Sequence, residues 1–121
     1  MKTKSRLRRC PPKPALAKRG LLTGGQAREL MGIFKVLAND TRLRLLHALA
    51  RDGELCVTEL AAALGKKPQA VSNQLQRLAD QRIVAARRGG NQVHYRVLDP
   101  CVMALLDRGL CLAEDRDGGC S

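Results

Sequence analysis

Aromatic residues are nearly absent from this sequence, which has one Phe, one Tyr and no Trp among its 121 residues. A core without aromatic rings has to be built from Leu, Val, Ile, Ala and Met, which favours packed helices over an aromatic-rich β-sandwich. The length supports one domain, and the 45% of hydrophobic residues suffices for a core with little to spare. A second copy of the chain would relieve that shortage.

Long apolar runs are also missing. The longest uninterrupted run covers residues 101–106, far short of the ~20 residues that cross a bilayer. Prolines at positions 11, 12 and 14 follow the basic N-terminus where a secretory signal would have its apolar segment. We therefore predict a cytoplasmic protein with no membrane partner. In that reducing compartment the five cysteines are expected to be free thiols or metal ligands rather than a disulfide framework.

Catalytic motifs are a third absence. The sequence has no Ser-His-acid set, no phosphate-cradling glycine loop and no paired His-Glu motif. It therefore predicts neither an enzyme nor an organic cofactor. Histidine is scarce as well: His47 falls in a leucine-rich helical pattern and His94 in a strand-like run, where packing or hydrogen bonding explains an imidazole better than metal ligation does.

Acidic residues are outnumbered two to one, with 11 Asp and Glu against 22 Lys and Arg, and the formal net charge is +11. Residues 1–20 hold eight basic and no acidic groups, residues 21–98 twelve and six, and residues 99–121 two and five. The central part of the chain is thus basic even without its N-terminal segment. This balance predicts a polyanionic partner, for which double-stranded DNA is the leading candidate.

The apolar spacing predicts five helices and one hairpin. Helical patterns cover residues 26–37, 42–50, 56–64, 68–81 and 100–114, and two strand-like runs, 82–88 and 92–98, flank a glycine turn. This order predicts a winged helix-turn-helix, mainly α with a small β-hairpin. We expect residues 24–114 to form this DNA-binding and dimerisation domain, residues 1–23 a basic, Pro-containing flexible arm, and residues 115–121 a flexible tail.

The helix-turn-helix is expected over residues 56–78. Gly65 ends its first helix, and Pro68 fits the first turn of the second, whose outward face offers amide, hydroxyl and guanidinium groups to bases and phosphates. The alternatives are a merely solvated helix face and, for the wing arginines, protection of a sheet edge. The predicted DNA-binding residues are Lys66, Lys67, Gln69, Ser72, Asn73, Gln74, Arg77, Arg87, Arg88 and Asn91.

Four blocks resemble, in order and spacing, the ArsR/SmtB family of metal-sensing bacterial repressors. They are ANDTRLRLL (38–46), ELCV (54–57), VSNQLQRL (71–78) and GNQVHY (90–95), and the resemblance covers roughly residues 26–113. It implies a homodimeric, operator-binding repressor that releases DNA when an inducer binds. The operator is expected to be an inverted repeat, because a twofold protein reads two half-sites.

The inducer site is expected among the cysteines. Cys101 and Cys111 lie ten positions apart, about 15 Å along a helix, too far to share one ion within a protomer. Two last helices packed antiparallel across a dimer axis would bring Cys101 of one near Cys111 of the other. The resemblance implies a zinc site at this helix pair built from two acids and two imidazoles. The corresponding residues here are Asp99, Cys101, Leu112 and Asp115, so both imidazoles are missing.

The resemblance also implies a soft-metal site that joins the N-terminal arm to the helix starting near Cys56. Cys56 and the acid Glu59 are present, whereas the cysteine that many relatives have two residues later is Thr58, so Cys10 would be needed. A buried small hydrophobe is the other interpretation of Cys56. Cys120 is either a further ligand or a bystander. Thiolate donors select soft ions, and Hg(II), As(III), Cd(II) and Pb(II) are the expected inducers.

Two other functions remain open from the sequence. One is a thiol-redox-sensing repressor of the same fold, in which Cys101 and Cys111, or Cys10 and Cys56, form a disulfide instead of holding an ion. The other is a constitutive basic architectural protein, which would show little preference for an inverted repeat over random duplex.

Overall fold

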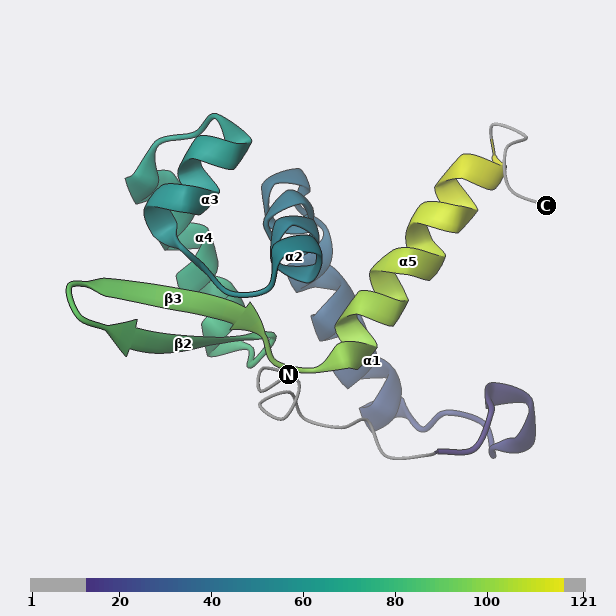
Figure 1. The fold of residues 1–121 in the computed structure, drawn as a ribbon. Coiled ribbons are helices and arrows are strands. Elements are labelled where there is room, and N and C mark those ends of the chain that lie inside the picture. The colour runs from purple at the N-terminus through teal and green to yellow at the C-terminus, as the bar shows by residue number, and fades with distance from the viewer. Residues whose placement is uncertain (1–12, 117–121) are drawn as a thin grey trace.

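The computed structural model describes residues 13–116. Cys10, Cys120, most of the expected arm and the end of the expected tail therefore lie outside the described residues. The elements follow in the order η2 (Leu16–Lys18), α1 (Gly24–Leu37), α2 (Asp40–Asp52), β1 (Leu55–Cys56), α3 (Val57–Leu64), α4 (Pro68–Asp80), β2 (Val84–Gly89), β3 (Gln92–Val97) and α5 (Pro100–Asp115). Figure 1 shows the β2–β3 hairpin and α5 extending away from each other on opposite sides of α2.

Local capping explains where the first two helices begin. Thr23 is the N-cap of α1: its hydroxyl accepts a hydrogen bond from the Gln26 backbone N–H, and the Gln26 side chain accepts one from the Thr23 N–H. The helix thus starts at Gly24, two residues before the predicted start. Asn39 caps α2 through its side-chain oxygen, which accepts from the Arg42 N–H at 3.0 Å.

The sheet has three antiparallel strands in the order β1-β3-β2, where the sequence predicted only a hairpin. The added strand pairs Leu55 with Tyr95 and Cys56 with His94. The prediction that Cys56 opens a helix was therefore wrong by one residue, because Cys56 ends β1 and is the N-cap of α3. A two-residue strand is too short for an alternation pattern, which is why the sequence did not reveal it.

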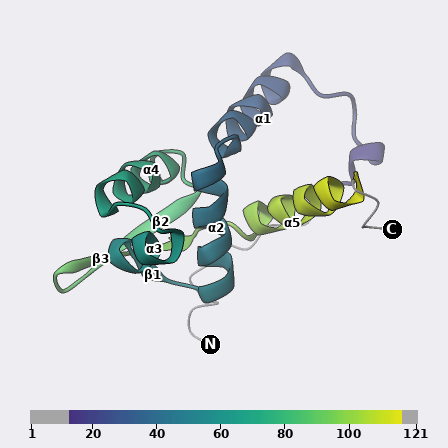
Figure 2. The same cartoon turned by 90° about the horizontal axis from the view of Figure 1, so that it is seen from above.

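One core joins α2, α3, α4 and the sheet. Its fully buried side chains are Leu45, Leu46, Leu49, Leu60, Val71, Leu75, Leu78 and Val84. By contrast, α5 has no buried residue and α1 has only Leu37. Figure 2 shows both helices extending from α2 on the side away from the hairpin. We call α2, α3, α4 and the sheet the body, and α1 with α5 the projecting helices.

Within residues 13–116, none of the helices combines the length and apolar character that crossing a membrane requires.

Candidate nucleic-acid interface and effector site

The turn between α3 and α4 has the geometry of a tight helix-turn-helix. Gly65 adopts a left-handed conformation with φ of 67°, and the Lys66 N–H donates to the Ala61 carbonyl at 3.0 Å, which satisfies the end of α3. Pro68 stands in the first turn of α4, as predicted. Lys66 and Lys67 are both exposed on this turn, where flexible ammonium groups suit phosphate contacts.

The recognition helix α4 separates an apolar from a polar face. Its inner face buries Val71, Leu75 and Leu78 against the body. Gln69, Asn73 and Arg77 are exposed on the outer face, and the Gln69 amide donates to the Asn73 side-chain oxygen at 3.1 Å. This bond fixes two neighbouring amides relative to each other, and Ser72 lies half-buried on the same helix. The outer face thus offers polar groups to DNA, and their base contacts stay predictions.

Gln74 differs from the other predicted DNA-binding residues of α4 in its contact with the body. It is half-buried, and its side-chain oxygen accepts a hydrogen bond from Arg42 Nε at 2.7 Å. Any contact that Gln74 makes with a base would therefore use its amide nitrogen. Sequence reasoning missed Arg42, because a single arginine near a helix start carries no signal for a contact made 32 residues away.

The wing ends in a two-residue turn, Gly90-Asn91, in which Gly90 has φ of 65° and Gly89 pairs with Gln92. Arg88 is exposed beside the tip. Arg87 makes a two-point ion pair with Glu54, at 3.0 Å from Nε and 2.8 Å from Nη2. The Glu54 carboxylate also raises the pKa of Arg87. A phosphate therefore has to compete with Glu54 for this arginine. The pairing of Arg87 with Glu54 was not predictable from the sequence, because the two residues lie 33 positions apart.

Cys56 lies at the base of the wing and is a free thiol that is 5% exposed. Its backbone N–H donates to the Glu59 carboxylate at 2.9 Å, and its sulfur lies 3.2 Å from the Thr58 hydroxyl oxygen. The hydrogen bonds from Cys56 lower the pKa of Glu59. In this arrangement Glu59 caps α3, and Cys56 packs as a small buried side chain. The predicted metal site with Cys10 has its second cysteine outside the described residues.

Cys101 and Cys111 both lie on α5, Cys101 exposed and Cys111 half-buried. Neither is a free thiol in this structure, which departs from the expectation of free thiols for a reducing compartment. Within residues 13–116, no group of three or more His, Cys, Asp or Glu side chains is placed to hold a metal ion. A thiolate site on α5 would therefore need further donors, from outside the described residues or from a second copy of the chain.

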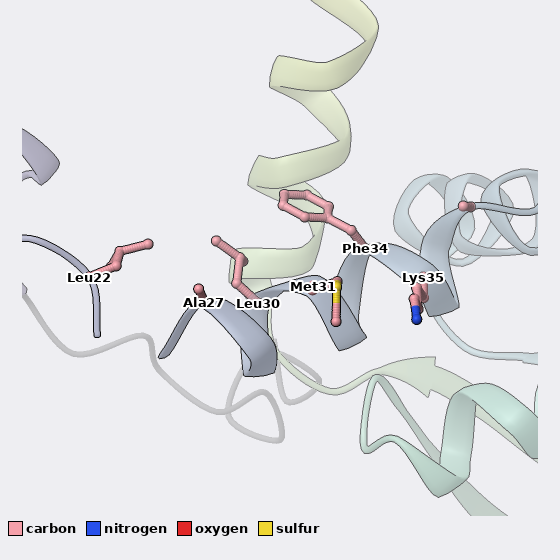
Figure 3. Close-up of a pocket in the computed structure, with 7 residues that line it drawn as sticks. Leu22, Ala27, Leu30, Met31, Phe34 and Lys35 are labelled. Atoms are coloured by element: carbon pink, nitrogen blue, oxygen red, sulfur yellow. The ribbon is translucent and has the colours of Figure 1, made fainter. Parts of the chain in front are cut away.

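The projecting helices expose a large apolar surface. A groove of about 1100 Å³ runs between α1, α2 and α5, and its lining includes Phe34, Leu43, His47 and Leu110. On α1 an adjoining hollow of about 440 Å³ is lined by Leu22, Leu30, Met31 and Phe34 among others. Figure 3 shows Leu30 and Phe34 projecting from the same side of α1. Exposed side chains of this size are typical of an interaction surface.

Comparison with known proteins identifies the family to which this architecture belongs. The family model of the bacterial regulatory proteins of the arsR family matches residues 39–86. The structure of the antimony-specific transcriptional repressor AntR is 64% identical, with a TM-score of 0.78, and the match covers 90% of this chain and 98% of that one. The chain belongs to the arsR family. This confirms the family expected from the four sequence blocks and the predicted winged helix-turn-helix fold.

Two further relatives of this arsR-family chain are informative. The transcriptional repressor SmtB homolog of a Synechocystis species is 49% identical over 80 residues, 66% of this chain and 60% of that one. The homodimeric winged helix-turn-helix domain Mb0332 from Mycobacterium bovis is 31% identical with a TM-score of 0.66, covering 80% of this chain and 92% of that domain. Because the family consists of regulatory proteins, the prediction that the chain is not an enzyme is also confirmed.

Proposed function

We propose that this arsR-family protein is a homodimeric repressor that binds an operator in duplex DNA and releases it when α5 thiolates bind a soft metalloid or metal ion. The observation that carries this proposal is the position of Cys101 and Cys111 on α5, a helix that packs on the core near its start and keeps Leu110 and Leu112 more than half exposed. A dimer formed through α5 would place the effector donors in the dimer interface, away from the DNA-reading face.

A second copy of the chain is the occupant we propose for the apolar groove. Leu110 and Leu112 on α5 are 59% and 64% exposed, and Ile33 and Phe34 on α1 are 42% and 48% exposed. A twofold interface buries each of these side chains twice, which multiplies the gain from each. The homodimeric state of the related Mycobacterium bovis domain supports this arrangement.

The DNA-binding mode follows from the body. Twofold symmetry would place two α4 helices in successive major grooves, roughly 34 Å apart, on an inverted repeat. Gln69, Asn73 and Arg77 would face base edges, while Lys66, Lys67 and Arg88 would neutralise phosphates. Binding should then weaken steeply with salt, by roughly 0.9 log unit per phosphate for each log unit of salt. Such a regulator would act in the cytoplasm, where bacterial DNA is.

For the inducer, similarity to an antimony-specific repressor adds Sb(III) to the soft ions expected from the cysteines. We place Sb(III) and As(III) first, ahead of Hg(II), Cd(II) and Pb(II), because the first two are trivalent metalloids that share a preference for thiolates. In the reduced protein, Cys101 and Cys111 would supply two of the donors. Cys56 is the weaker candidate, since it is buried in the body and bonded to Thr58.

The proposed switch is a change in how the two protomers are arranged. Cys101 and Cys111 of two antiparallel α5 helices, once joined to one ion, would hold the protomers at a spacing that no longer fits the half-sites. Because the coupling is reciprocal, operator DNA would lower the affinity for the ion by the same factor that the ion lowers operator affinity.

The test is anaerobic titration of the fully reduced protein, bound to a fluorescent duplex that it selects from a random pool. Sb(III) or As(III) should release the duplex at stoichiometric concentration, and Cys101→Ser or Cys111→Ser should abolish release without lowering affinity. Cys56→Ser is the matched control, and this variant should still release the duplex when the ion is added.

Three outcomes would overturn the proposal. Release that needs peroxide and is reversed by dithiothreitol identifies the redox-sensing alternative. If the protein retains DNA in every soft-ion titration, a soft ion is not the inducer. If the protein selects no sequence from the pool, it is an architectural protein.

A further inference from the structure

We infer that Arg42 is a positioning residue that fixes the recognition helix α4 against α1 and thereby sets the half-site spacing that the dimer accepts. The inference rests on the proposed function, because it concerns how the DNA-reading face is aligned with the dimer. Arg42 itself has no place in the proposed DNA contacts or in the effector site.

The guanidinium of Arg42 connects three helices. The Arg42 backbone N–H donates to the side-chain oxygen of Asn39, the N-cap of α2, at 3.0 Å. From there the side chain donates through Nη1 to the Val36 carbonyl of α1 at 2.8 Å, and through Nε to the Gln74 side-chain oxygen of α4 at 2.7 Å. Both bonds are partly buried, which limits competition from water.

The bond to Val36 is directed at the end of α1. The last four carbonyls of a helix lack an intrahelical partner, and Val36 is the penultimate residue of α1. A cation at this end also complements the negative pole of the helix. Arg42 therefore holds the end of α1 where the chain turns into α2, a junction that Figure 2 shows beside α4.

The bond to Gln74 acts on α4 and limits its rotation. Gln74 is half-buried and lies between Asn73, on the exposed face, and Leu75, in the core. Holding its oxygen restricts rotation of α4 about its axis, which would otherwise redirect the outer polar face. Within the described residues, α1 buries only Leu37, so packing alone gives α1 a weak hold on the body. Arg42 thus adds a directional polar link between a helix of the proposed dimer surface and the DNA-reading helix.

The test measures spacing preference. Duplexes carry the half-sites selected by the wild-type protein, separated by the preferred spacing or by one or two base pairs more or fewer. For the wild type we expect affinity to drop about tenfold or more at the wrong spacings. Arg42→Met keeps the length of the side chain but loses both bonds from a charged group, and should reduce that discrimination about tenfold.

Companion variants separate positioning from other roles. Gln74→Leu breaks the same bond from the other side, remains informative if Arg42→Met fails to fold, and should be non-additive with it in a double-mutant cycle. Arg51→Met removes an arginine from the same helix, where it pairs only with exposed Asp52 among the contacts seen, and should leave spacing discrimination unchanged.

The dependence on salt identifies a direct DNA contact. If Arg42→Met lowers the salt slope by about one phosphate, Arg42 binds the backbone and the inference is wrong. Unchanged discrimination in both Arg42→Met and Gln74→Leu would overturn it equally. If the wild type selects no half-sites at all, the proposed function itself is wrong. That result differs from a lowered salt slope and from unchanged discrimination, which contradict the role of Arg42 alone.

Discussion

The body and the projecting helices are built from similar residues but bury them very differently. Leu45, Leu60 and Leu75 in the body are fully buried. Leu110 and Leu112 on α5 are more than half exposed. The contrast follows from packing: the helices of the body enclose a core together with the sheet, whereas α1 and α5 line an open groove.

This difference separates the region proposed to read DNA from the region proposed to bind the effector. The body can hold its DNA-reading face in a single chain, because its contacts are internal. Within residues 13–116, the projecting helices keep apolar side chains exposed, and α5 includes both Cys101 and Cys111. Under the proposed function, the DNA-reading face and the effector donors would therefore lie in different parts of the fold.

The largest expected effect is on the projecting helices. Leu110→Glu places a charge in the proposed interface twice per dimer, and loses the burial of two leucines, about 3–6 kcal/mol. Sedimentation should show a monomer at concentrations where the wild type is a dimer, with the circular dichroism of the body retained. A Leu110→Glu protein that still sediments as a dimer would place the interface elsewhere.

Unfolding of that monomeric variant then isolates the body. In the Leu110→Glu background, Leu60→Ala should cost about 2–5 kcal/mol in the free energy of unfolding, because Leu60 is fully buried. Leu112→Ala, at a position that is 64% exposed, should change it by no more than about 0.5 kcal/mol. Urea titration measures both, and equal losses would contradict the division into two regions.

Two glycines, one in each region, sharpen the comparison further. Gly65 has φ of 67°, so Gly65→Ala should destabilise the body by about 1–2 kcal/mol. Gly109 lies inside α5, and an added Cβ there meets no atom within 4 Å. Gly109→Ala should therefore stabilise α5 by about 0.5–1 kcal/mol in the monomeric background. Thermal unfolding of the two variants should shift in opposite directions.

A smaller effect concerns pH. Hydrogen bonds from Cys56 lower the folded-state pKa of Glu59. The ionised carboxylate thus contributes stability that is present above the pKa of an unfolded glutamate and is lost as pH falls through the lowered folded-state value. Glu59→Gln should flatten this acid-side decline in unfolding experiments, whereas Glu29→Gln on α1 serves as the control for loss of one charge. An unchanged decline in Glu59→Gln would show that the cap contributes nothing.

The smallest effect is expected in the wing. Glu54→Gln weakens the ion pair with Arg87, whose side chain is 43% exposed, and so makes this arginine available to phosphate. Exposed ion pairs are worth little, so affinity for any duplex should rise by no more than about fivefold. The salt slope should become steeper. A change in sequence preference instead would mean that the wing reads bases.

The sequence predicted the elements whose pattern repeats over several turns. The apolar spacing of α2 and α4 and the turn residues Gly65 and Gly90 were sufficient for the winged helix-turn-helix. Contacts between distant residues were not predictable, because neither Arg42 with Gln74 nor Arg87 with Glu54 leaves a periodic signal. The cysteine site is the part least accessible from one chain, since any shared ion would need donors from beyond the described residues.

The two-residue strand β1 has a consequence for how the protein can move. Its pairing with β3 joins the residues just before α3 to the hairpin, so the helix-turn-helix and the wing are connected through one sheet. Moving the helix-turn-helix relative to the wing would break backbone pairs in the sheet, whereas rotating one whole protomer against the other in the proposed dimer would break none. In the proposed dimer, the helix-turn-helix and wing of each protomer should therefore superimpose between the DNA-bound and released forms, which would differ only in the angle between the two protomers.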